Sequence, residues 1–219
     1  MQAIAVIAGI ELSAGPGGKP TAYDHRMGMM SISRAITLHA TERPHEPALT
    51  CGDVTLSWQQ FDRRTNRLAR AFAEMGVGQD DLVTIALPNS TAFFESAFAA
   101  WKLGATPQPV SAKLPGRELE EIVELADSKI VVGVEPGRIP HRTCVPVGDE
   151  PDHAISDGEL PDAVTTHWKA PTSGGSTGRP KIIVATVPGR FDTDAAGFGL
   201  PARSACVIPG VLYHNAPFS

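Results

Sequence analysis

The sequence predicts an α/β fold in which a parallel sheet is flanked by helices. Three strand-like stretches, at 82–87, 106–110 and 130–134, alternate with two segments whose apolar residues recur at helical spacing. The first stretch, LVTIAL, is almost continuously apolar, as expected of a strand covered on both faces. An order of strand, helix, strand, helix, strand predicts parallel strands with helices on both sides of the sheet.

Residues 1–28 differ in character from the chain that follows them. Ala3–Ile10 is apolar, but no basic residues precede it and Glu11 follows at once, which disfavours a secretion signal. The sequence SAGPGGKP at 13–20 is rich in turn-forming residues. We therefore expect a flexible leader over 1–28 and a domain over 29–219.

The domain is expected to begin with a helix, a hairpin and a second helix. Ile32, Ile36 and His39 fall on one face at helical spacing. The stretch 48–56 has Gly-Asp at its centre and reads as a short β-hairpin. Ser57 and the glutamine three residues later have the spacing of a capping box, which predicts the start of the second helix. The buried stripe of that helix is predicted to consist of Phe61, Leu68, Phe72 and Met75.

Two further helices are expected between the strands of the parallel sheet. The first follows Pro88-Asn89-Ser90, and its aromatic residues at 93, 94, 98 and 101 are interpreted as core. The second covers Arg117–Ala126, with glutamates on its solvated side and with Leu119, Ile122 and Leu125 predicted as its core face. A proline-rich connecting segment is expected over 131–164, with weak strand character near 143–147.

Chemistry is predicted for the hairpin at 165–186, where two strand-like stretches flank the sequence PTSGGSTGRPK. Its glycines allow backbone N–H groups to converge on an anion, while its hydroxyls and lysine add donors and positive charge. Such a set suits a triphosphate or pyrophosphate. The predicted phosphate-binding residues are Thr172, Ser173, Gly174, Gly175, Ser176, Thr177, Gly178 and Lys181.

Two common phosphate-binding motifs do not fit this hairpin. The NTPase loop needs a glycine where Arg179 or Pro180 stands, and it precedes a helix, whereas Ile182-Ile183-Val184 reads as a strand. The dinucleotide fingerprint GxGxxG is also missing. From the residues alone, two alternative interpretations of this hairpin remain open. It could be a flexible Gly/Ser-rich turn, or part of an unrelated α/β nucleotide-binding protein.

The stretch 172–181 resembles the phosphate loop of the adenylate-forming (AMP-binding) superfamily. This superfamily includes acyl-CoA synthetases, aryl-CoA ligases, luciferases and the adenylation domains of peptide synthetases. The stretches 55–58, 99–109 and 212–217 also resemble its N-terminal region. Most members have threonine where Gly175 stands. This glycine, together with Tyr213-His214-Asn215 downstream, makes the chain resemble the bile-acid and fatty-acyl CoA ligase branch.

The resemblance implies a carboxylate–CoA ligase (AMP-forming) that uses ATP, Mg²⁺ and coenzyme A. A small-molecule carboxylic acid would be activated as an acyl-adenylate and passed to coenzyme A. Residues 172–178 would hold the phosphates, Lys181 would neutralise their charge as the catalytic cation, and His214 would lie next to the acyl substrate.

The resemblance covers only the N-terminal part of that fold. The family's Mg²⁺ ligand, adenine-binding strand and C-terminal domain have no counterpart in this chain, so we expect an N-terminal fragment that is inactive alone. An alternative is a non-enzymatic binding or assembly module that retains the fold. The acid itself is not specified by these residues.

Composition and charge disfavour several other classes of protein. The 19 basic and 24 acidic residues give a net charge of −5, and no basic stripe indicates a nucleic-acid surface. No apolar run is long enough for a transmembrane helix. Cys51, Cys144 and Cys206 are far apart, as is typical of reduced cytoplasmic thiols, and the seven histidines show no metal-ligand spacing. An incomplete fold would expose apolar surface, which favours a homo-oligomer.

Overall fold

A computed structural model describes residues 4–8, 28–173, 180–193 and 204–218. Within these ranges the helices are α1 (Ile32–Glu42), α2 (Trp58–Glu74), α3 (Thr91–Lys102) and α4 (Gly116–Ala126). The strands are β1 (Ile4–Ala8), β2 (Met29–Ser31), β3 (Pro47–Cys51), β4 (Val54–Ser57), β5 (Leu82–Ile85), β6 (Thr106–Pro109), β7 (Ile130–Val132), β8 (Thr143–Val145), β9 (Thr172–Ser173), β10 (Lys181–Ile182), β11 (Arg190–Asp192) and β12 (Ser204–Ile208).

The predicted parallel sheet is confirmed, with the strand order β6-β5-β7-β8. Leu82 of β5 aligns with Thr106 of β6, and Val83 aligns with Ile130 of β7, all in parallel register. The edge strand β8 pairs with β7. The segment 131–164 therefore does more than connect, since it supplies part of β7 and all of β8 to the sheet. Both strands fall where the sequence has strand character, at 130–134 and near 143–147, and β8 is only three residues long.

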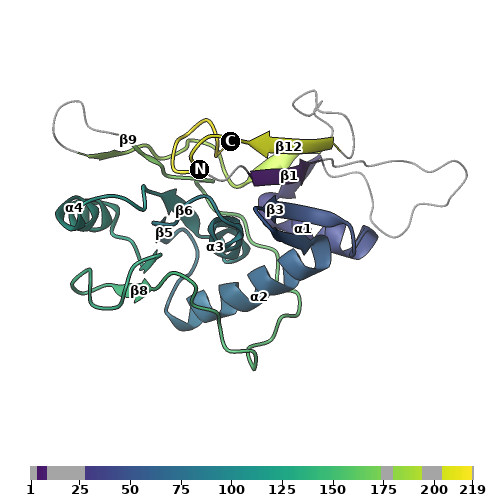
Figure 1. The fold of residues 1–219 in the computed structure, drawn as a ribbon, viewed down its shortest axis with the longest axis horizontal. Helices are drawn as coiled ribbons and strands as arrows, with labels where there is room; N and C mark the ends of the chain where they lie inside the picture. The colour runs from purple at the N-terminus through teal and green to yellow at the C-terminus, as the bar shows by residue number, and fades with distance from the viewer. Residues whose placement is uncertain (1–3, 9–27, 174–179, 194–203, 219) are drawn as a thin grey trace, which may run out of the picture.

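Helices cover both faces of this sheet, as the apolar strands predict (Figure 1). Side chains of β7 alternate: Ile130 and Val132 pack in the core beneath α2 and α3, while Val131 packs in a second core with α4. The core face predicted for α4 needs one correction. Leu125 is 56% exposed, and Val123 and Ala126 are buried beside Leu119 and Ile122 instead, because the apolar stripe is turned by one position.

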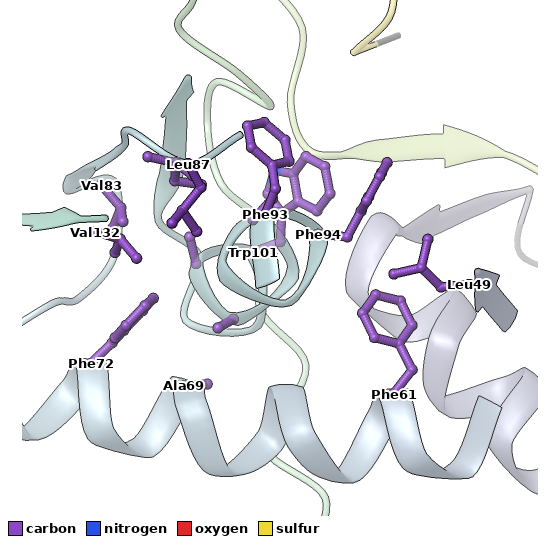
Figure 2. Close-up of a cluster of buried hydrophobic side chains, with 14 of the residues drawn as sticks. Leu49, Phe61, Ala69, Phe72, Val83, Leu87, Phe93, Phe94, Trp101 and Val132 are labelled. Carbon is purple, nitrogen blue, oxygen red and sulfur yellow. The ribbon is translucent and has the colours of Figure 1, made fainter. Parts of the chain in front are cut away.

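The larger core lies between α2, α3 and the sheet. The side chain of Ser57 accepts from the backbone N–H of Gln60, whose own side chain accepts from the backbone N–H of Ser57, so the predicted capping box starts α2. From α2, Phe61 and Phe72 point toward α3 and the strands (Figure 2). All four aromatic residues interpreted as core in α3 pack there, three of them buried and Phe98 partly buried.

Polar side chains also join α2 to α3 inside the fold. The Lys102 ammonium donates to Asp62 Oδ1 and to Asn66 Oδ1, both at 2.7 Å. Thr37 of α1 donates to the same Asp62 oxygen at 2.9 Å. Lys102 is 6% exposed, so this ion pair is desolvated and holds the three helices in one arrangement.

A second sheet has the order β12-β1-β3-β4, and all of its neighbouring strands are antiparallel. The β3–β4 pair is the predicted hairpin at 48–56. Strand β1 pairs with both β3 and β12, although its residues fall within the expected leader over 1–28. Strand β2 pairs with β11, so the start of the domain lies beside the chain that follows the phosphate hairpin. In the described part of the chain, no helix is long and apolar enough to cross a membrane.

Candidate phosphate-binding site

The hairpin predicted at 165–186 is built as a two-stranded ribbon. In its short ladder Ser173 lies opposite Lys181, and Thr172 lies opposite Ile182. Backbone hydrogen bonds continue below the ladder, from Ile183 N to Pro171 O at 2.8 Å, from Ala185 N to Lys169 O at 3.0 Å and from Trp168 N to Val187 O at 3.1 Å. We call residues 165–173 and 181–189 the phosphate ribbon.

Of the predicted phosphate-binding residues, three lie at the base of the loop within the described chain. Thr172 and Ser173 end one strand of the ribbon and Lys181 begins the other, so the structure brings these three together. Ser173 Oγ donates to Lys181 O at 3.4 Å, and the Lys181 side chain is exposed. The remaining predicted residues, Gly174, Gly175, Ser176, Thr177 and Gly178, lie outside the described residues.

A buried polar chain fixes the beginning of the loop to the parallel sheet. Gln108 Nε2 donates to Thr172 Oγ1 at 2.9 Å, and the Gln108 side-chain oxygen accepts from Thr84 Oγ1 of the neighbouring strand. The Thr84 hydroxyl also lies within hydrogen-bonding distance of Ser128 Oγ. Gln108 and Thr84 are fully buried, so their partners must come from the protein. Thr84 inside the otherwise apolar β5, and Gln108 between two prolines of β6, were the available sequence signal, and sequence reasoning missed it.

The backbone of the ribbon is attached to β6 as well. Ala170 N donates to Pro107 O at 3.0 Å, and Thr106 Oγ1 donates to His167 O at 2.8 Å. These bonds place the ribbon along the strand β6 at the edge of the parallel sheet (Figure 1). The base of the predicted phosphate loop is therefore held by the core rather than by local turns alone.

His214 lies in a compact turn that follows β12, which we call the His214 segment (210–218). Its backbone N–H donates to Val211 O at 3.1 Å, and its ring lies 4.5 Å from that of Tyr213. The imidazole is exposed. Asn89 holds the start of this segment, since its Nδ2 donates to Gly210 O at 2.8 Å and its Oδ1 accepts from Leu212 N at 3.0 Å.

Lys169 connects the phosphate ribbon to the end of the His214 segment. Its ammonium donates to Asn215 O at 2.9 Å and to Phe218 O at 2.6 Å. The residue is 4% exposed, and desolvation lowers the pKa of its amine to about 8. Sequence reasoning did not single out this lysine, although a charge between Trp168 and Ala170 in a strand-like stretch is unusual enough to be a signal.

No metal centre is formed by the described residues, where no group of three or more His, Cys, Asp or Glu side chains is placed to hold an ion. Among these residues the thiols of Cys51 and Cys144 are buried and that of Cys206 is half-buried, and none of the three forms a disulfide. We therefore assign Mg²⁺ to no residue of the described chain.

The chain is similar to known proteins in family profile, in sequence and in structure. A family profile described as AMP-binding enzyme matches residues 36–191. Novobiocin biosynthesis protein H of Streptomyces niveus is 32% identical over 185 residues, which cover 76% of this chain and 29% of that protein. The long-chain-fatty-acid–CoA ligase FadD13 of Mycobacterium tuberculosis is 23% identical over 87% of this chain and 41% of its own length.

One further relative is named for a different acyl acceptor, and a solved structure has a similar fold. The fatty acid–[acyl-carrier-protein] ligase ScoC of Streptomyces coeruleorubidus is 26% identical over 73% of this chain and 34% of that protein. O-succinylbenzoate coenzyme A synthetase (MenE) from Bacillus subtilis, solved in complex with AMP, aligns with a TM-score of 0.62 and 20% identity, over 71% of this chain and 42% of that one. The chain thus spans less than half the length of these proteins.

Proposed function

Because the chain belongs to the family of AMP-binding enzymes, we propose that it is the N-terminal portion of an ATP-dependent carboxylate–CoA ligase. Such an enzyme joins a carboxylic acid to AMP and then transfers the acyl group to coenzyme A. The family match also removes the unrelated nucleotide binder from the alternatives left open by the sequence. The relatives in the comparison are ligases or biosynthetic proteins, which supports an enzyme rather than an assembly module.

The observation that carries this proposal is the fixed base of the phosphate loop. Ser173 lies directly across the ribbon from Lys181, and the buried Gln108 side chain donates a hydrogen bond to the neighbouring Thr172. In the proposed reaction the loop at 172–178 cradles the β- and γ-phosphates of ATP. Because the base is anchored in the core, the donors it carries are preorganised for an anion and cost little reorganisation on binding.

Lys181 is proposed to act as the cation of this site. During adenylation the carboxylate oxygen bonds to the α-phosphorus, the bond from that phosphorus to the bridging oxygen breaks, and pyrophosphate leaves with the added negative charge. An exposed ammonium at the base of the loop can approach that charge. Mg²⁺, when bound, would offset further phosphate charge, and its ligands are not assigned in this chain.

His214 is proposed to lie at the carboxylate of the acyl substrate. Its exposed imidazole is on the segment that Lys169 ties to the phosphate ribbon, so the two halves of the proposed site are neighbours. An imidazole can orient a carboxylate by hydrogen bonding in either protonation state. Coenzyme A is proposed as the acceptor on the basis of the Gly175 and Tyr213-His214-Asn215 resemblance, with an acyl-carrier protein as the competing acceptor named for a relative.

Titration calorimetry with pyrophosphate tests the role of the loop. We expect Lys181→Ala to bind pyrophosphate about tenfold more weakly than the unaltered chain, because one charge-assisted contact is lost. Lys113→Ala removes an exposed lysine from a different loop and is the matched control, expected to bind as the unaltered chain does. Equal affinities for all three proteins would remove the role proposed for Lys181.

A further inference from the structure

The His214 segment is held at two points, one on each side of its histidine. Asn89 forms two hydrogen bonds to residues before His214, at Gly210 and Leu212. Lys169 forms two hydrogen bonds to residues after it, at Asn215 and Phe218. The exposed imidazole lies between these two attachments, so its position depends on both.

Aromatic packing shows that the second attachment is part of the core rather than a surface contact. The Phe218 ring is 4% exposed and stacks on Trp101 of α3, with centroids 5.7 Å apart and planes inclined by 7°. It also stacks on Trp168, at 6.1 Å and 28°. The Lys169 ammonium lies 4.0 Å from the centroid of the Trp168 ring, a distance at which a desolvated cation is attracted to the ring face.

The backbone of Lys169 belongs to the phosphate ribbon. Its carbonyl accepts from Ala185 N across the ribbon, and it stands three residues before Thr172, where the predicted loop begins. Its side chain therefore links a different part of the chain to the ribbon. Lys169 and the aromatic rings around it attach the His214 segment to the described part of the phosphate ribbon.

We propose that Lys169 is a positioning residue that sets the place of His214 relative to the phosphate loop. The proposal rests on the function proposed above, in which the loop holds phosphates and His214 faces the carboxylate. Adenylation requires the carboxylate oxygen and the α-phosphorus to meet within a fraction of an ångström of the right geometry, and the groups that hold them come from separate segments. Lys169 touches neither reactant, and it acts by fixing the separation of the two segments.

Hydrogen–deuterium exchange followed by mass spectrometry tests this coupling in the 219-residue chain. In Lys169→Met we expect exchange in 210–218 to accelerate at least about tenfold, because two charge-assisted hydrogen bonds to carbonyls are lost. Exchange in β5 should stay unchanged. Lys169→Arg, which keeps the donors and the charge, should restore most of the protection, and Lys113→Met is the matched control.

Two further measurements separate positioning from general loosening of the fold. The imidazole proton resonances of His214, assigned with His214→Gln, should shift in Lys169→Met and return toward the original values in Lys169→Arg. Pyrophosphate affinity should change less than twofold in Lys169→Met, whereas Lys181→Ala tests the proposed function itself. Unchanged exchange at 210–218, or unshifted His214 resonances, in a folded Lys169→Met chain would overturn the proposal.

The unaltered chain offers a test that does not depend on any variant folding. A water-soluble amine acetylating reagent at neutral pH should label Lys169 at least about tenfold more slowly than Lys113. Burial and two hydrogen bonds to carbonyls keep the reagent from the Lys169 amine, and this outweighs the larger neutral fraction that its lowered pKa allows. Equal labelling of the two lysines would show that Lys169 does not hold the His214 segment, and would overturn the proposal.

Discussion

The imidazole of His39 packs 4.5 Å from the ring of Trp58, and an Arg43 guanidinium nitrogen lies 3.2 Å from both of its ring nitrogens. Burial, with a smaller contribution from the Arg43 charge, lowers the pKa of His39 to about 4. The sequence places His39 on the buried side of its helix, and burial confirms this. The electrostatic consequence was beyond sequence reasoning, because it depends on where Arg43 folds back.

This pKa predicts a loss of stability in mild acid. Above pH 6.5 His39 is neutral in both folded and unfolded chains and contributes nothing to pH dependence. As the pH falls from 6.5 to about 4, the unfolded chain takes up the proton first, so the free energy of unfolding decreases, by up to about 3 kcal/mol. In His39→Phe this part of the decrease should disappear, as measured by urea unfolding at several pH values.

A matched control for the acid effect is the exposed His45, whose replacement by glutamine should leave the pH profile unchanged. A profile for His39→Phe that is parallel to that of the unaltered chain would contradict the prediction.

Lys169 and Gln108 are two residues whose roles could not be predicted from the sequence. Each is a polar side chain in a strand-like stretch, and its role depends on partners 46 and 64 positions away in the chain.

At the scale of elements, α2 is the helix whose features are most fully readable from sequence. Its capping box, its apolar stripe and its end at Gly76 can each be recognised from neighbouring residues in the sequence. Gly76 adopts a positive φ of 90°, a backbone conformation typical of the residue that ends a helix. By contrast, β8 has only three residues and β9 only two, too short for a periodic pattern. Those strands form because neighbouring backbone is already in place to pair with them.

Truncating Phe72 measures how much α2 contributes to the main core. The side chain is fully buried against the sheet, so we expect Phe72→Ala to lower the free energy of unfolding by about 3–5 kcal/mol through lost burial and a cavity. Glu74→Ala, on the exposed side of the same helix, should change it by less than about 0.5 kcal/mol. Urea unfolding of the three chains provides the comparison, and a loss below 1 kcal/mol for Phe72→Ala would contradict this packing.

For the molecule as a whole, the fold class was predictable because its strands and helices alternate in simple order. The site was predictable only in part: the loop has a sequence motif, whereas its attachment to the core has none.

The activity of the whole chain gives a further test. We expect the 219-residue chain alone to catalyse carboxylate-dependent ATP–pyrophosphate exchange at least about a hundredfold more slowly than a full-length ligase, because the proposed N-terminal portion carries no assigned Mg²⁺ ligand. Exchange at a comparable rate would contradict both the fragment proposal and this reasoning.

The pairing of β2 with β11 has a consequence for how the chain folds. Helices α2 and α3 and strands β5 to β7 are contiguous in sequence, so their contacts need only short loops to close. Ser31 pairs with Arg190 only after nearly the whole domain has been brought together. Each doubling of loop length costs only about 0.6 kcal/mol of closure entropy, so this pairing costs little stability, but distant contacts slow folding. The phosphate ribbon, which leads directly into β11, is therefore expected to lock into place late, after the sheet that supports it has formed.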